Sequence, residues 1–304
     1  MIPRLSLPLA LVASQVLAHG GLNNYTVGDT WYRGYATHPS SRPISSSARI
    51  QKEELSNPPP SYDPNSSPES QLSQPWLVQR PWDSIDPIFD HDSPYLACNH
   101  PGTAAAAYIP IEAGDEITAV YWYWLHPTGP MAVWLADCGE SCEDVEPAEL
   151  EWFKVSPFLT LLVLTFPFFP APLSLNPPTS PSSASPLPRR SATSRPRLTH
   201  AQQIWHAALT DNGALGLASS TWYQKAFQNW DGRPATWPVA IPPRLKPGLY
   251  LIRHEIISMH VAYRPQWYPE CAHLNVSGTG DAVPGEEYLY KFPGAYSKDG
   301  ELIS

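Results

Sequence analysis

Apolar side chains recur along this chain in short β-branched and aromatic runs, whereas long amphipathic helical repeats are scarce. Residues 116–124 combine Ile, Val, Tyr and Trp after the turn residues 113–115, which predicts a strand. Residues 249–257 form a similar run behind a Pro-Gly turn, and residues 272–276 alternate apolar with polar side chains. Short strands separated by Pro, Gly and Asn predict an all-β protein, a β-sandwich with long loops.

Residues 155–203 do not fit this pattern. They hold ten prolines, four arginines, no glycine and no acidic residue. A segment of this composition neither pairs in a sheet nor spans a membrane. Val155-Ser156 can be encoded by the splice-donor-like GTGAGT and Gln203 by the acceptor-like CAG, so we interpret the stretch as a translated, unspliced intron. The alternative is a genuine Pro-rich linker between two domains.

The composition narrows the class of protein further. The chain has 304 residues, of which 42% are hydrophobic and only 15% charged, so wholesale disorder is excluded. Its 19 Lys and Arg against 28 Asp and Glu give a net charge of -9, which argues against a nucleic-acid partner. The Ser- and Pro-rich residues 40–74 are interpreted as a surface loop or a disordered insertion.

The first 18 residues have the charged, apolar and small-residue regions of a secretory signal. Their apolar run is shorter than the ~20 residues of a membrane-spanning helix, which disfavours the alternative of a membrane anchor. Cleavage after Ala18 makes His19 the first residue of a secreted, extracellular protein. The four cysteines are an even number that suits disulfides, and three Asn-X-Ser/Thr sequons permit glycosylation.

A histidine at a free amino terminus is an unusual ligand, because its α-amine and its ring nitrogen can chelate one metal ion together. A second histidine then completes three nitrogen donors, a set that favours copper among the first-row metals when a weak axial oxygen is added. His126 is the candidate, since it follows the strand of residues 116–124 in the loop Leu-His-Pro-Thr-Gly-Pro.

Several motifs occur in one order along the chain. They are His19-Gly20 behind the leader, Ala97-Cys98-Asn99, His126-Pro127-Thr128-Gly129-Pro130, Trp152-Phe153-Lys154, residues 247–257 (Pro-Gly-Leu-Tyr-Leu-Ile-Arg-His-Glu-Ile-Ile), and Gln266-Trp267-Tyr268-Pro269-Glu270-Cys271. This order resembles the fungal lytic polysaccharide monooxygenases of auxiliary activity family 9, formerly glycoside hydrolase family 61. The resemblance covers nearly the whole of residues 19–304 apart from residues 40–74 and the stretch after Lys154.

The resemblance implies a single catalytic domain over residues 19–304, interrupted by residues 155–203. Its fold would be an immunoglobulin- or fibronectin-like β-sandwich with a flat, copper-bearing face. One copper ion per chain would be held by the amine and ring of His19, the ring of His126 and the axial hydroxyl of Tyr268. Gln266 and His260 would act beside Tyr268 in catalysis. The resemblance also implies two disulfides, Cys98 with Cys271 and Cys138 with Cys142.

The implied activity is oxidative cleavage of cellulose or a related β-1,4-glucan at C1, C4 or both. It would use O2 or H2O2 and an external electron donor, and the enzyme would act as a monomer with no membrane partner. Tyr25 and Tyr296 are candidates to stack on sugar rings, although either could pack inside instead.

Three other functions remain open on the sequence. They are a copper-binding protein of the same fold without turnover, a hydrolytic glycosidase with paired carboxylates, and a non-catalytic carbohydrate-binding module. A zinc-protease interpretation of His254-Glu255 is disfavoured, because the next histidine follows after six residues instead of four and the segment is predicted as a strand.

Overall fold

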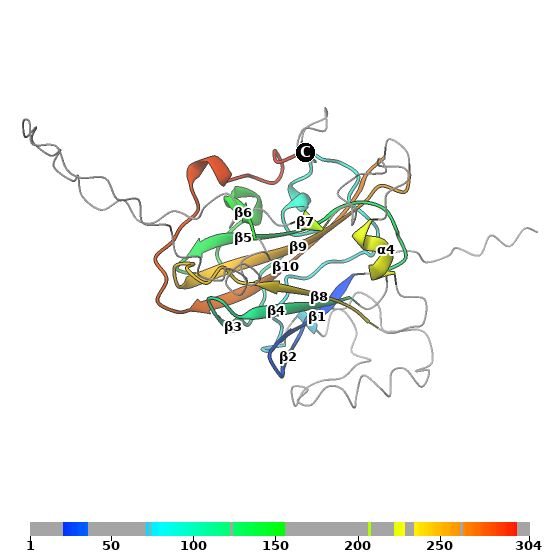
Figure 1. Ribbon diagram of the computed structural model, residues 1–304. Coiled ribbons are helices and arrows are strands. Elements are labelled where there is room, and N and C mark those ends of the chain that lie inside the picture. Colours follow the sequence, from blue (N-terminus) through cyan, green and yellow to red (C-terminus); the bar gives the residue numbers. More distant parts are fainter. Residues whose placement is uncertain are drawn as a thin grey trace, which may run out of the picture.

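The computed structural model describes residues 21–35, 71–72, 74–121, 124–155, 206–207, 222–228, 234–261 and 264–296. The predicted leader, His19, most of residues 40–74 and residues 156–203 lie outside these ranges. The described part of the chain forms two β-sheets that face each other, as Figure 1 shows. The predicted all-β sandwich is therefore confirmed.

The smaller sheet has four antiparallel strands. In spatial order they are β2 (Thr30–Arg33), β1 (Leu22–Val27), β4 (Glu116–Tyr121) and β8 (Ala235–Ala240). β4 is the strand predicted over residues 116–124, and it ends three residues earlier. The register of β1 on β4 shifts between Leu22 and Asn24, so Leu22 sits at an irregular position.

The larger sheet carries the two longest strands at its centre. In spatial order its strands are β3 (Ile109–Glu112), β10 (Gln266–Ser277), β9 (Gly248–Ser258), β5 (Met131–Gly139) and β6 (Trp152–Lys154), with β7 (His206–Ala207) also paired to β5. All pairs are antiparallel except β3 with β10. The helical segments are η1 (Pro94–Leu96), η2 (Pro147–Glu149), α4 (Tyr223–Phe227) and η3 (Glu286–Tyr288).

β9 is apolar at most positions because both of its faces are covered. One core lies between the two sheets and includes Ile252 and Ile256, and a second core on the outer face includes Leu251 and Ile257. A strand that is buried on both sides shows a continuous apolar run instead of alternation. The outer core explains why residues 249–257 have no period of two, although they form a strand as predicted.

Both disulfides that the resemblance implies are present. Cys98–Cys271 joins the loop after η1 to β10 across 173 positions of sequence. Cys138–Cys142 closes the short turn after β5. The first disulfide fixes a loop against the strand that carries Gln266 and Tyr268.

Around the Pro-rich stretch, the described residues on either side of positions 156–205, Val155 and His206, pair with neighbouring positions of β5. β6 pairs with β5 as far as Lys154, and the Val155 amide donates to the Val133 carbonyl at 2.9 Å. β7 pairs with β5 at the next position, where His206 lies opposite Ala132. Strands before and after the stretch share both sheets. A single domain interrupted by residues 155–203 stays a prediction.

His254 is a fully buried histidine on β9 in the space between the sheets. It packs against Tyr25 and Trp237, and neither ring nitrogen has a hydrogen-bond partner. Burial lowers the pKa of His254 to about 3. Since the folded pKa lies below the unfolded value, the stabilising contribution is present above about pH 6.5 and is lost as the pH falls towards 3.

The His254→Leu protein is therefore expected to lose less stability on acidification than the wild type. Each buried neutral histidine costs about 1.4 kcal/mol of unfolding free energy per pH unit below its unfolded pKa. His273, whose pKa burial also lowers to about 3, keeps contributing in the variant. Denaturant titrations at pH 7, 6 and 5 measure the slopes, and equal slopes in the two proteins would contradict this account of His254.

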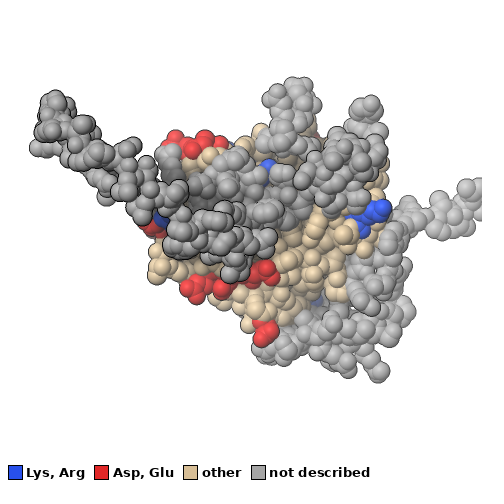
Figure 2. All heavy atoms as spheres, in the orientation of Figure 1, with Lys and Arg blue, Asp and Glu red and all other residues tan. Residues whose placement is uncertain are grey.

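The visible surface carries more acidic than basic side chains, in keeping with the net charge of -9. Figure 2 shows carboxylates in several groups on the described surface, while basic side chains appear at fewer places. In the ranges that the structure describes, no helix combines the length and the apolar character needed to cross a membrane.

Candidate metal centre

His126 lies in the tight loop between β4 and β5 and is almost completely buried. The indole nitrogen of Trp124 donates to the His126 carbonyl at 2.9 Å, and the two rings meet edge to face at 5.3 Å. Gly129 in the same loop has a φ of 129°, and a Cβ there would lie 1.9 Å from the Ile257 carbonyl oxygen. The loop is therefore pressed against the end of β9, which restricts where the His126 ring can lie.

Gln266 and Tyr268 occupy the start of β10. They are two residues apart, so their side chains share one face of the strand, as the sequence predicts. The Tyr268 hydroxyl donates to Gln266 Oε1 at 2.9 Å. The same hydroxyl lies 3.4 Å from His126 Nε2, and the Trp124 ring packs edge-on against Tyr268 at 4.9 Å.

His260 completes the group from the chain just beyond β9. Its ring stacks on the His126 ring with centroids 4.1 Å apart and an angle of 12° between the planes. Its Nδ1 lies 2.6 Å from Ser258 Oγ, and the residue is exposed. The structure thus brings together four of the five residues predicted to form the centre, His126, His260, Gln266 and Tyr268, which we call the His126 site.

Tyr268 offers the site a neutral oxygen. Burial raises the pKa of its hydroxyl well above the usual value of a tyrosine, and the charge of Asp86 acts in the same direction. The hydroxyl is therefore protonated at neutral pH. A protonated phenol is a weak oxygen donor, which suits the axial role predicted for it.

The fifth predicted residue, His19, lies outside the described residues, but the structure shows where the chain that leads to it is held. Leu22 donates its amide to Glu270 Oε2 at 3.0 Å. Glu270 is two residues beyond Tyr268 on β10 and lies about 6.7 Å from it along the strand. His19 is three residues before Leu22, a separation that spans at most about 10 Å.

Two buried glutamines near the site carried no sequence signal. Gln224 of α4 donates to the Ile257 carbonyl at 2.8 Å and accepts from Trp124 Nε1 at 3.3 Å, which ties the His126 loop to the end of β9. Gln79 donates to the Leu22 carbonyl at 2.9 Å. Glu270, by contrast, could have been found from the sequence, because it continues the two-residue period of Gln266 and Tyr268.

The prediction that Tyr25 stacks on sugar rings is wrong. Tyr25 has no exposed surface and packs between the sheets against His254. Its position on β1 faces the larger sheet, so the alternative that it packs inside holds. Tyr296 is half-buried against Trp267, and its hydroxyl donates to Glu255. A contact between Tyr296 and a sugar stays a prediction.

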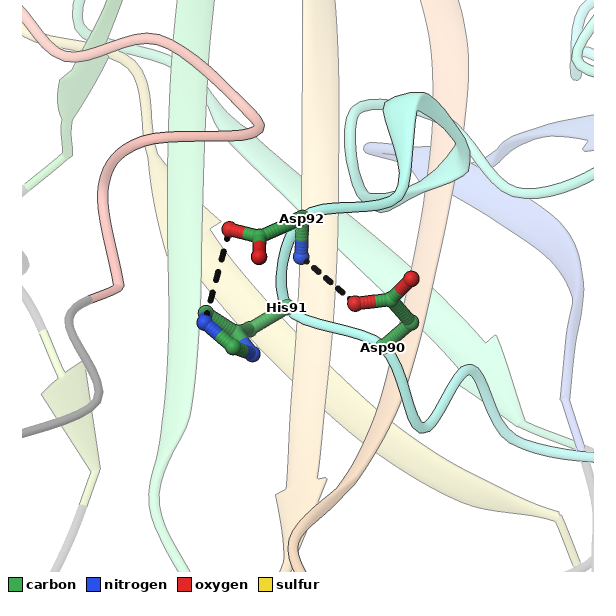
Figure 3. A group of neighbouring side chains, drawn as sticks. All are labelled: Asp90, His91 and Asp92. Atoms are coloured by element: carbon green, nitrogen blue, oxygen red, sulfur yellow. Dashed lines mark hydrogen bonds and ion pairs between the residues drawn. The ribbon is translucent and has the colours of Figure 1, made fainter.

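A second group of possible metal ligands lies in an exposed turn before η1. Asp90, His91 and Asp92 are consecutive, and one ligand atom of each lies within 4.8 Å of the others. Figure 3 shows His91 Nε2 at 3.4 Å from Asp92 Oδ1, and the Asp92 amide donating to Asp90 Oδ1 at 3.0 Å. The turn itself accounts for this proximity, so we assign no metal to the group.

The donors of the His126 site fit copper better than a hard cation. An imidazole nitrogen and a protonated phenol oxygen converge, and an amino-terminal histidine would add two nitrogens. A β-sandwich that brings such donors together at one end defines a candidate metalloprotein.

The comparisons with known proteins specify this class. The family model of Auxiliary Activity family 9 (formerly GH61) matches residues 19–159 and 197–304, and the chain belongs to this family. Lytic polysaccharide monooxygenase B of Heterobasidion irregulare is 28% identical over 98% of this chain and 87% of its own length. Lytic polysaccharide monooxygenase D of Thermothelomyces thermophilus is 26% identical over 97% of this chain and 84% of its own length.

Solved structures agree with this assignment. The crystal structure of HiLPMO9B covers 92% of this chain and 88% of its own, with a TM-score of 0.58 and 25% identity. A cellulose-active polysaccharide monooxygenase from M. thermophila covers 94% and 90%, with a TM-score of 0.60 and 24% identity, and supports the fold. The chain is thus a lytic polysaccharide monooxygenase, a copper-dependent oxidoreductase that degrades polysaccharides by oxidation.

Proposed function

We propose that this protein is secreted as a monomer that begins at His19 and cleaves cellulose or a related β-1,4-glucan. Oxidation would take place at C1, C4 or both, with O2 or H2O2 as co-substrate and an external electron donor. The convergence of His126, His260, Gln266 and Tyr268 carries this proposal. The M. thermophila monooxygenase that shares this fold is cellulose-active, which is consistent with the proposed substrate.

In this proposal, the amine and ring of His19, the ring of His126 and the hydroxyl of Tyr268 hold one copper ion. Copper, when bound, supplies the one-electron and oxygen chemistry of the reaction. The Tyr268 hydroxyl donates to Gln266 Oε1, and its oxygen lies 3.4 Å from His126 Nε2. This hydrogen bond would hold the orientation of the Tyr268 oxygen towards a bound copper ion.

Gln266 and His260 present further polar groups at the site. Because Gln266 Oε1 accepts from Tyr268, its Nε2 is the group that can donate towards the co-substrate. Ser258 Oγ lies 2.6 Å from Nδ1 of His260, and this exposed ring can exchange protons with solvent or substrate. We infer that both residues hold the co-substrate in place and that His260 carries a proton to or from it.

The test combines amino-terminal sequencing of the secreted protein with product analysis on cellulose. Copper-loaded protein with ascorbate is expected to release aldonic acids or C4-oxidised sugars. A matched variant with one alanine inserted before His19 keeps both histidines but moves the free amine away from the first ring, and it should release neither. Reducing sugars formed without a reductant would instead indicate a hydrolase, and copper binding without products would indicate a non-catalytic copper protein.

We further infer that residues 155–203 are not part of the functional domain of residues 19–304. The family model leaves residues 160–196 unmatched, inside this stretch, which supports the inference. Excision joins Lys154 to Ile204, which would take the place of the buried Val155 opposite Val133 if the pairing of His206 with β5 shifts by one position. Both residues are β-branched and apolar, so the core would keep a side chain of the same kind.

The shortened chain without residues 155–203 is therefore expected to fold at least as stably as the full chain. Thermal unfolding followed by circular dichroism should give an equal or higher Tm, and copper binding should persist. Replacing Ile204 with Asp in the shortened chain is the matched control, and it should lower the Tm because it buries a carboxylate opposite Val133. A shortened chain that fails to fold, or a mature transcript that retains these codons, would contradict the inference.

A further inference from the structure

We propose that Glu270 is a positioning residue for the amino-terminal copper ligand, because it holds the backbone of Leu22, three residues after His19. The proposal rests on the proposed function, in which His19 binds copper. Its evidence comes from contacts among described residues, starting with the two polar groups of the Leu22 backbone.

Both backbone groups of Leu22 are bound by side chains from outside the smaller sheet. The Leu22 amide donates to Glu270 Oε2 at 3.0 Å, and its carbonyl accepts from Gln79 Nε2 at 2.9 Å. Gln79 in turn accepts from the Tyr35 amide at 2.7 Å through Oε1, so its amide group has a fixed orientation. The register shift between Leu22 and Asn24 separates Leu22 from the regular ladder with β4. Leu22 is thus held in place by Glu270 and Gln79.

The residue before Leu22 has almost no room to move. A Cβ on Gly21 would lie 2.4 Å from the Trp82 ring and 2.7 Å from Glu270 Oε1. Glycine fits here because any side chain would collide with the Trp82 ring and the Glu270 carboxyl. The backbone at Gly21 therefore lies close to Glu270.

Glu270 itself belongs to a rigid frame that also carries Tyr268. The two side chains share a face of β10, and the next residue, Cys271, is bonded to Cys98. The Arg80 amide donates to the Cys271 carbonyl at 2.8 Å, which fixes the segment that carries Gln79 against the same strand. The distance between the held Leu22 backbone and the Tyr268 hydroxyl is therefore set by a single strand.

The chemistry of Glu270 also needs an explanation. Its side chain is 98% buried, and no cationic side chain of the described residues pairs with it. A buried carboxyl without an ion-pair partner is costly, and an apolar residue would pack at this place more favourably. A carboxyl at this position supplies a hydrogen-bond acceptor for the Leu22 amide, and a leucine would not.

The experiment compares Glu270→Leu with Glu270→Gln in the secreted protein that begins at His19. The glutamine keeps an oxygen that can accept from Leu22, whereas leucine removes it. We expect Glu270→Leu to weaken copper binding by about 10- to 100-fold and to change the Cu(II) electron paramagnetic resonance spectrum. Glu270→Gln should stay close to the wild type in both. Gly21→Ala displaces the same segment from the other side, and it should change the spectrum while Glu270 is intact.

His254→Leu is the matched control, because His254 lies directly opposite Glu270 on β9 and is equally buried. It should alter stability but not copper affinity or the spectrum. Glu270→Leu and Gly21→Ala proteins that merely unfold at lower temperature, with wild-type copper affinity and spectra, would overturn the inference and leave the proposed function intact. A wild-type protein that begins at His19 and binds no copper would overturn both.

Discussion

Replacing His126 with alanine is expected to lower the affinity for Cu(II) by more than about 100-fold and to abolish oxidative cleavage. Loss of residues that merely orient a metal ligand typically costs 10- to 100-fold in affinity, and His126 is proposed as a ligand itself. Calorimetric titration of the metal-free protein with Cu(II) measures this effect. The metal-free variant should remain folded, because the sheets on both sides of the loop are joined independently of it.

His91→Ala is the control for this prediction. His91 belongs to the exposed group with Asp90 and Asp92, to which we assign no metal. Its replacement should leave the affinity for copper at the wild-type value. If His91→Ala abolished binding and His126→Ala did not, the metal centre would have been assigned to the wrong histidine.

Removing the Cys98–Cys271 disulfide is expected to produce the largest loss of stability. The bond closes a loop across 173 positions, and loop-closure entropy predicts a loss of roughly 5 kcal/mol on replacing both cysteines with alanine. The logarithmic dependence on length makes this figure nearly the same with and without residues 155–203. Denaturant unfolding of the oxidised proteins measures the difference in unfolding free energy.

The Cys138–Cys142 disulfide provides the matched comparison. Its cysteines are only four positions apart, so the same relation predicts a loss of roughly 2 kcal/mol. Removal of the long-range disulfide should also weaken copper binding, because Cys271 directly follows Glu270 and its carbonyl accepts from the Arg80 amide. Equal losses of stability in the two variants would contradict the entropic explanation.

Much of the architecture could be predicted from local patterns. β-branched and aromatic runs mark β4 and β9 because such side chains pack well on a pleated surface. The two-residue spacing of Gln266 and Tyr268 places both on one face of β10, as the structure shows. His126 was recognisable as a loop residue held by Pro and Gly, and its partners were then supplied by the family resemblance.

Other features depend on residues that are far apart in the sequence. Tyr25 looked equally suited to a surface and to a core, and the packing of β1 against the larger sheet buries it. Gln224 meets Trp124 across 100 positions, and it does so only because α4 lies against the His126 loop. No periodicity in either segment indicates that contact.

The sequence by itself therefore indicated three of the strands, predicted His19 as the first residue of the secreted protein and determined which residues resemble a copper site. The tertiary structure alone decided that His126, His260 and Tyr268 meet at one point and that Leu22 is bound by Glu270, 248 positions away. The physical reason is that side chains along a strand alternate between its two faces, so the face of each residue follows from its local sequence. Which residues lie against that face depends on how the sheets pack.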